Sequence, residues 1–97
     1  MNTKLNTELY DGPTKSGKKH GHGTLHFKNG DVYCGNFVDD SIRGYGEIEY
    51  YTGAHYRGIF RDNMKDGQGQ MKYYNGSVYK GDFTNDIKHG YGVLKDH

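Results

Sequence analysis

The chain has 97 residues, enough for one domain, and its 13 basic against 12 acidic residues give a net charge of +1. This balance provides no basic patch or stripe of the kind that nucleic-acid-binding proteins normally carry, so no nucleic-acid partner is expected. Hydrophobic residues make up only 32% of the chain, but 14% of it is aromatic, which argues against disorder. We therefore predict a leader over residues 1–8 and a single, thin domain over residues 9–97.

A unit of 23 residues occurs four times, over about residues 10–32, 33–55, 56–78 and 79–97. Each unit starts with a tyrosine and has a glycine two residues later, as Tyr33 and Gly35 show. A Gly-x-Gly pair such as Gly44 and Gly46 follows, and this lattice contains 15 of the 16 glycines. Self-similarity at a fixed period predicts a repeat array in which each unit contacts only its neighbours.

The units translate into strands and turns in chain order. In the first unit, Pro13 follows the glycine and Thr14 replaces the phenylalanine of later units, which predicts an atypical capping unit at a sheet edge. In the second, alternation with a period of two predicts strands over residues 33–37 and 46–50, joined by a six-residue polar loop. Residues 51–55 form a turn to the third unit, and the later units repeat this plan. The prediction is an all-β fold: an elongated, single-layer antiparallel sheet of consecutive hairpins with about eight short strands.

The loop lengths also predict which residues lie opposite each other. Within the second unit, the expected partners are Tyr33 with Ile48, Gly35 with Gly46 and Phe37 with Gly44. Between the second and third units, they are Tyr50 with Tyr56, Ile48 with Gly58 and Gly46 with Phe60. Phenylalanine rings would then lie over bare glycine backbone, because glycine within a strand marks a close approach.

This pairing separates the two faces of the sheet. The tyrosines, phenylalanines and glycines of the lattice share one face. The other face receives polar residues: Asn36, Glu47, Glu49, Arg57, Gln68, Gln70, Lys72, Lys80, Asp82 and Lys95. There Glu49 meets Arg57, a pair worth about 0.2–1 kcal/mol, but Lys72 unfavourably meets Lys80.

The motif resembles the MORN repeat (membrane occupation and recognition nexus). The third unit carries it most clearly, in Tyr56-Arg57-Gly58-Ile59-Phe60, Gly67-Gln68-Gly69 and Asn75-Gly76. The resemblance covers about residues 10–95 and implies an elongated single-layer sheet of consecutive hairpins. Because a thin sheet of short strands encloses little volume, we do not expect an enzyme. The resemblance also implies a scaffold or adaptor, because MORN domains recur in cilia, cytoskeletal assemblies and membrane junctions, and as accessory domains of lipid kinases and a histone methyltransferase.

The aromatic face is the predicted site for a protein partner, either a helix or an extended peptide. A one-layer sheet would expose a larger apolar patch than ordinary monomers show. The candidate partner-binding residues are Tyr33, Phe37, Tyr50, Tyr56, Phe60, Tyr73, Tyr79 and Phe83. Two alternatives use the same face: the rings only hold the sheet together, or they mediate self-association.

A rival hypothesis is peripheral binding to anionic phospholipid membranes through basic loop residues. The candidate lipid contacts are Lys15, Lys18, Lys19, Arg43, Lys65 and Lys88. Acidic residues in the same loops would cancel much of that attraction: Asp39, Asp40, Asp62, Asp66 and Asp86.

Other chemistry is weakly supported. His20, His22 and His26 could bind a metal with Cys34, which the predicted register places opposite His26, but solvated side chains are the simpler interpretation. Gly-x-Gly lacks the following helix and Lys-Ser/Thr pair of a phosphate-binding loop, and nothing marks a catalytic triad. We expect no cofactor and no metal. A single cysteine and the lack of an apolar signal segment predict a cytoplasmic protein. The resemblance to the MORN repeat implies that it is associated with the cytoskeleton, a cilium or a membrane.

Overall fold

The computed structural model describes residues 8–95, without the side chains of residues 87–94, so nearly all of the predicted leader lies outside the described residues. This part of the chain contains ten strands: β1 (Leu9–Asp11), β2 (Thr14–Lys15), β3 (Lys18–Lys19), β4 (Gly21–His26), β5 (Val32–Val38), β6 (Ser41–Glu49), β7 (His55–Arg61), β8 (Met64–Lys72), β9 (Val78–Thr84) and β10 (Ile87–Lys95). Eight of them form one sheet in the order β1-β4-β5-β6-β7-β8-β9-β10, and β2 pairs with β3 separately.

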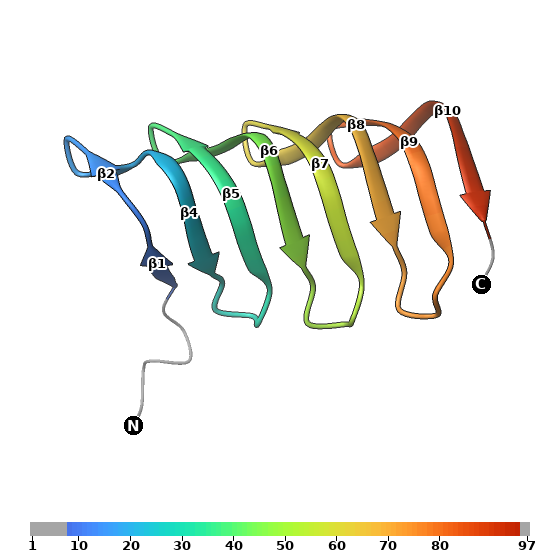
Figure 1. Ribbon diagram of the computed structural model, residues 1–97, viewed down its shortest axis with the longest axis horizontal. Coiled ribbons are helices and arrows are strands. Elements are labelled where there is room, and N and C mark those ends of the chain that lie inside the picture. The colour runs from blue at the N-terminus through green and yellow to red at the C-terminus, as the bar shows by residue number, and fades with distance from the viewer. Residues whose placement is uncertain (1–7, 96–97) are drawn as a thin grey trace.

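The predicted all-β array of consecutive antiparallel hairpins is confirmed. Figure 1 shows the strands side by side from the N-terminal to the C-terminal end, with turns along an upper and a lower edge. The molecule measures 41 × 32 × 17 Å, so it is much thinner than it is long. Within the described residues there is no helix long and apolar enough to cross a membrane.

The hairpins close at the upper edge through two-residue turns. In Asp39–Asp40, Asp62–Asn63 and Asn85–Asp86, both residues have φ between 47° and 71°. Positive φ at both positions is the geometry of a type I′ turn, which Asp and Asn tolerate better than most residues. The predicted six-residue loop over residues 38–43 is therefore wrong, because strand pairing continues up to Val38 and Ser41.

Each hairpin bends halfway along its length. Gly44 and Gly67 have φ of 98° and 107°, a conformation that residues with a Cβ rarely adopt. The ladder between β5 and β6 shifts between Gly35 and Phe37, so Phe37 lies opposite Ile42 and not opposite Gly44 as predicted. This bulge and bend turn the upper half of the hairpin out of line with its lower half (Figure 1).

The register between hairpins differs from the prediction by two residues. The lower turn spans residues 50–54, closed by a hydrogen bond of 2.9 Å from Tyr50 N to Ala54 O, whereas residues 51–55 were predicted. Ile48 therefore lies opposite Tyr56, and Gly46 lies opposite Gly58. Because the side-chain period of a strand is two, this shift leaves each residue on its predicted face.

The corrected register changes the charge pairs of the polar face. Arg57 lies opposite Glu47, not opposite Glu49, which faces His55. The unfavourable contact predicted between Lys72 and Lys80 does not exist, because Lys72 faces Val78 and Lys80 faces Gln70. The two-residue shift thus removes the only like-charge pair of the predicted scheme.

The first unit departs from the others, as its sequence predicts for a cap. After β1 the chain leaves the main sheet at Pro13 and forms the small β2–β3 hairpin, whose turn is Ser16–Gly17. Tyr10 still follows the repeat, because it lies opposite Leu25 and donates its hydroxyl hydrogen bond to Pro13 O at 2.7 Å.

Candidate interaction surface

The lattice rings form a continuous ladder inside the molecule. Neighbouring tyrosine and phenylalanine rings meet edge to face, with centroids 5.1–5.4 Å apart. The order of contact is Tyr10, Phe37, Tyr33, Phe60, Tyr56, Phe83 and Tyr79. Each such contact is worth about 0.5–1.5 kcal/mol beyond the burial of the rings, so the ladder joins all four repeats.

Each tyrosine ring lies along the glycines of its own hairpin. Tyr33 donates a hydrogen bond to Asn36 O at 2.9 Å, and Tyr56 donates one to Ile59 O at 3.0 Å. A Cβ added at Gly46 would lie 2.5 Å from Cε1 of Tyr33. The prediction that phenylalanine rings cover these glycines is therefore wrong: the tyrosines do so, since their length along the strand brings the ring over the glycine pair.

Burial changes the acidity of these tyrosines. It raises the pKa of Tyr33 well above its ordinary value of 10.0, and it raises the pKa of Tyr56 to about 12. Both hydroxyls therefore remain protonated hydrogen-bond donors even near pH 10, where an unperturbed tyrosine is half ionised.

Six of the eight predicted partner-binding residues are buried within the chain: Tyr33, Phe37, Tyr56, Phe60, Tyr79 and Phe83. Tyr33 and Tyr56 have no exposed surface. The expectation of an exposed patch made by the whole ring set is wrong, because the bent hairpins and bare glycines let the rings cover one another. For these six residues, the structure agrees with the alternative that the rings hold the sheet together.

The two remaining candidates, Tyr50 and Tyr73, are half-buried and pack against the outside of the ring core. Phe27 has the same position in the preceding repeat and the same environment. We call Phe27, Tyr50 and Tyr73 the lower aromatic row. Sequence reasoning missed Phe27, although its spacing of 23 residues from Tyr50 is a signal that could have identified it.

Two further aromatics, Tyr51 and Tyr74, were also missed. They are 71% and 80% exposed in the lower turns, and each packs its Cβ against a glycine of the preceding turn, Gly30 or Gly53. The doubled tyrosines at residues 50–51 and 73–74 are the signal in the sequence. The lower edge therefore presents aromatic side chains at two levels of exposure.

Lys65 is a buried cation beside the lower aromatic row. Its Nζ donates a hydrogen bond to the Tyr50 hydroxyl at 3.0 Å and lies 3.3 Å from Oδ1 of Asp86. Nζ also lies 5.5 and 5.7 Å from the ring centroids of Tyr50 and Tyr56. Burial opposes the charge, but the hydrogen bond and charge of Tyr50, with that of Asp86, raise the pKa of Lys65 above 10.5.

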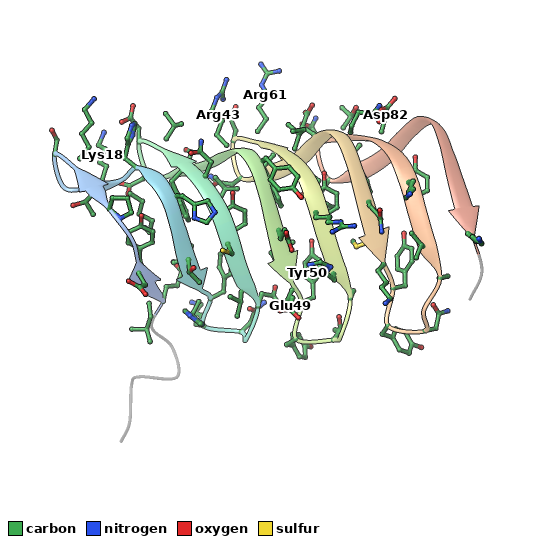
Figure 2. The ribbon with its side chains drawn as sticks, in the orientation of Figure 1. Lys18, Arg43, Glu49, Tyr50, Arg61 and Asp82 are labelled. Carbon is green, nitrogen blue, oxygen red and sulfur yellow. The ribbon has the colours of Figure 1, made fainter. Side chains whose placement is uncertain are left out.

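The predicted lipid contacts do not form one free cationic patch. Lys15 and Lys18 are exposed, and Lys18, Arg43 and Arg61 project from the upper edge (Figure 2). Arg43 pairs with Asp62 at 3.0 Å, and Lys19 lies 3.8 Å from Asp40. Lys65 is buried, and the side chain of Lys88 lies outside the described part.

The histidines and the cysteine do not converge. Cys34 lies opposite Thr24, whose hydroxyl donates to its Sγ at 3.7 Å, while His26 lies opposite Val32. The predicted contact between His26 and Cys34 is therefore wrong, again because the register differs by two residues. Among the described residues, no three His, Cys, Asp or Glu side chains are grouped so that they could hold a metal ion.

Comparison with known families assigns the repeats. A family model of the MORN repeat matches residues 15–32, 33–55, 56–78 and 79–96. These segments cover most of the chain, and the chain belongs to the MORN repeat family. MORN repeats are generally modules for interaction with proteins or membranes. The first match begins after Pro13, where the chain leaves the main sheet.

Proposed function

We propose that this protein is a non-enzymatic scaffold or adaptor module that binds a protein partner, a helix or an extended peptide, across the lower aromatic row. The observation that carries the proposal is the position of these rings, half-buried against the ladder of buried rings. Partially exposed aromatic side chains held by a rigid support are well suited to anchor a partner, because little side-chain freedom is lost on binding.

The spacing of the row fits both kinds of ligand. Each ring belongs to the residue that directly follows β4, β6 or β8, and these strands are two apart in the sheet, so successive rings are separated by about 9.6 Å. An α-helix advances about 10.5 Å in seven residues, and an extended peptide in the polyproline II conformation advances about 9.3 Å in each three-residue turn, which returns its side chains to the same face. A ligand with apolar residues at either interval could contact all three rings.

Affinity capture with matched tyrosine variants tests this proposal. Tyr73→Ala should reduce capture of the partner at least about tenfold, since removal of an aromatic hot-spot residue costs about 2 kcal/mol or more. Tyr74→Ala is the matched control, because this neighbour is 80% exposed in the turn and does not belong to the row. Equal capture by wild type and folded Tyr73→Ala and Phe27→Ala variants would rule out the row as the binding site.

Anionic phospholipid is the alternative ligand, at the exposed Lys15 and Lys18 of the upper edge. Sedimentation with anionic liposomes at low and moderate salt separates it from the first proposal. Liposome binding that disappears in Lys15→Gln/Lys18→Gln and persists in Tyr73→Ala would favour lipid. Binding that survives neutralisation of both lysines would reject this electrostatic mechanism.

Self-association is a third candidate. β10 is the last strand of the sheet in the described part of the chain, and an edge strand can pair with another chain. Light scattering over a range of concentrations tests it, and a constant monomer mass would reject it. The proposed setting is the cytoplasm, at the cytoskeleton, a cilium or a membrane, and the exposed thiol of Cys34 is compatible with a reducing compartment.

A further inference from the structure

Each two-residue turn is joined to the preceding repeat by reciprocal hydrogen bonds, which we call a clasp. Asn63 N donates to Ile42 O at 3.0 Å, and Ile42 N donates to Asn63 Oδ1 at 2.9 Å. The same bonds join Asp40 with Lys19, at 2.9 and 2.7 Å, and Asp86 with Lys65, at 2.9 and 2.8 Å. We call the contact between one repeat and the turn of the next a junction, and number the three junctions in chain order. The three clasps have the same backbone geometry, so the backbone alone does not distinguish one junction from another.

The side chains of the clasps differ in charge from one junction to the next, and in each clasp the two partners change together. Where the clasp residue is Asp, the preceding repeat supplies a lysine: Lys19 lies 3.8 Å from Asp40, and Lys65 lies 3.3 Å from Asp86. At the middle junction both charges are missing together, because the buried Ile42 meets the neutral Asn63.

A second pair of positions, next to each clasp, also carries side chains that match in charge at the first and second junctions. Arg43 lies 3.0 Å from Asp62, and His20 Nδ1 lies 4.0 Å from Asp39. The equivalent residues of the third junction are Asp66 and Asn85. At the third junction, the acidic Asp66 therefore replaces the basic Arg43 or His20, and the neutral Asn85 replaces the acidic Asp62 or Asp39.

We infer that these matched side chains fix the order in which the hairpins stack, and so prevent one hairpin from docking on the wrong repeat. If the turn of the fourth repeat docked on the second repeat, Asp86 would meet the buried Ile42. Arg43 would then face the neutral Asn85 and would lose its ion pair with Asp62. If the turn of the second docked on the third, Asp39 would meet Asp66. Near-identical repeats need such discrimination, since misassembly is a characteristic failure of repeat proteins.

Stability alone is a poor explanation for these charges. Exposed ion pairs such as Arg43 with Asp62 contribute little. In the Lys19–Asp40 and Lys65–Asp86 pairs the carboxylate is about half exposed, so these pairs also add little stability, and specifying a single arrangement is the better-attested use of such polar pairs. The middle junction already shows that an Ile–Asn clasp is compatible with this fold.

The test converts the third junction into a copy of the second. The variant carries Tyr50→Phe, Lys65→Ile, Asp66→Arg, Asn85→Asp and Asp86→Asn, which reproduces the residues at positions 27, 42, 43, 62 and 63. The control is Tyr50→Phe/Lys65→Arg, which alters two of the same positions but keeps a cation beside Asp86 and keeps every junction distinct. Each protein is melted thermally, and its fraction of dimer with mispaired repeats after refolding is measured by size exclusion with light scattering.

The copied junction should melt like wild type but yield about tenfold more dimer with mispaired repeats after refolding, which corresponds to a lost discrimination of about 1.4 kcal/mol. The control should refold to monomer. A copy that refolds to monomer as efficiently as wild type overturns the inference. A copy that fails to fold also contradicts it, because an Ile–Asn clasp is predicted to be as stable as the Lys–Asp clasp.

Discussion

Replacing Gly46 with alanine tests whether the tyrosine rings fill the space above the glycine pairs. The added Cβ would lie 2.5 Å from Cε1 and 2.6 Å from Cζ of Tyr33, and closer still to its hydroxyl oxygen. Real Cβ atoms essentially never show contacts under 3.0 Å. The ring of Tyr33, which is fully buried, must therefore move.

The cost of this movement can be worked out from the contacts that it disturbs. Tyr33 would lose its hydrogen bond to Asn36 O, worth about 0.5–1.5 kcal/mol. It would also weaken edge contacts with Phe37 and Phe60, each worth about 0.5–1.5 kcal/mol. Alanine also lowers the conformational entropy of the unfolded chain relative to glycine, which stabilises the folded state by about 0.4–1 kcal/mol. The free energy of unfolding should fall by about 1–4 kcal/mol.

Urea unfolding of wild type, Gly46→Ala, Tyr33→Leu and the double variant provides the measurement. If the ring causes the clash, the double variant should be destabilised by less than the sum of the single effects. Additive effects, or a Gly46→Ala protein as stable as wild type, would refute the packing described above.

Three further predictions concern the tyrosines and a clasp. The contribution of Tyr56 to stability should be fully present below pH 10 and fall by about 2–3 kcal/mol as the pH rises through about 12, because the unfolded chain releases the Tyr56 proton first. Urea midpoints should show a weaker fall in Tyr56→Phe, in which only the contribution of Tyr33 remains. Asn63→Gly keeps the positive φ but removes the acceptor of Ile42 N, and should cost about 1–3 kcal/mol in urea unfolding. Its control, Asp62→Gly, should cost less than about 1 kcal/mol because its ion pair is exposed. Tyr74→Ala should leave the melting temperature nearly unchanged, because most of this side chain is in solvent; a large drop would show that the turn tyrosines support the sheet.

Several features of the fold could be predicted because they depend only on spacing. The 23-residue period fixed the number of hairpins, and alternation fixed the two faces of each strand. Both survived an error in register, since a shift of two residues leaves Ile48 and Glu47 on their predicted faces. The separation of faces is therefore a more robust prediction than any single cross-strand pair.

The turns were harder to predict, since their geometry depends on φ angles that the residue types only permit. Asp39–Asp40 contains no glycine, yet both residues adopt positive φ. That choice makes the turn two residues long and lengthens the strands. The lower turn also begins one residue earlier than predicted, at Tyr50, which changes every partner between hairpins.

The candidate surface was predicted in part for the same reason. The sequence identified the aromatic positions, but burial depends on how neighbouring hairpins bend over one another. Tyr33 and Phe60 are 27 residues apart in sequence and meet edge to face at 5.2 Å. The sequence by itself therefore determined the repeat, the strands and the composition of each face. Only the tertiary structure decided which rings remain accessible, because the bend at Gly44 and Gly67 brings rings of adjacent repeats into mutual contact.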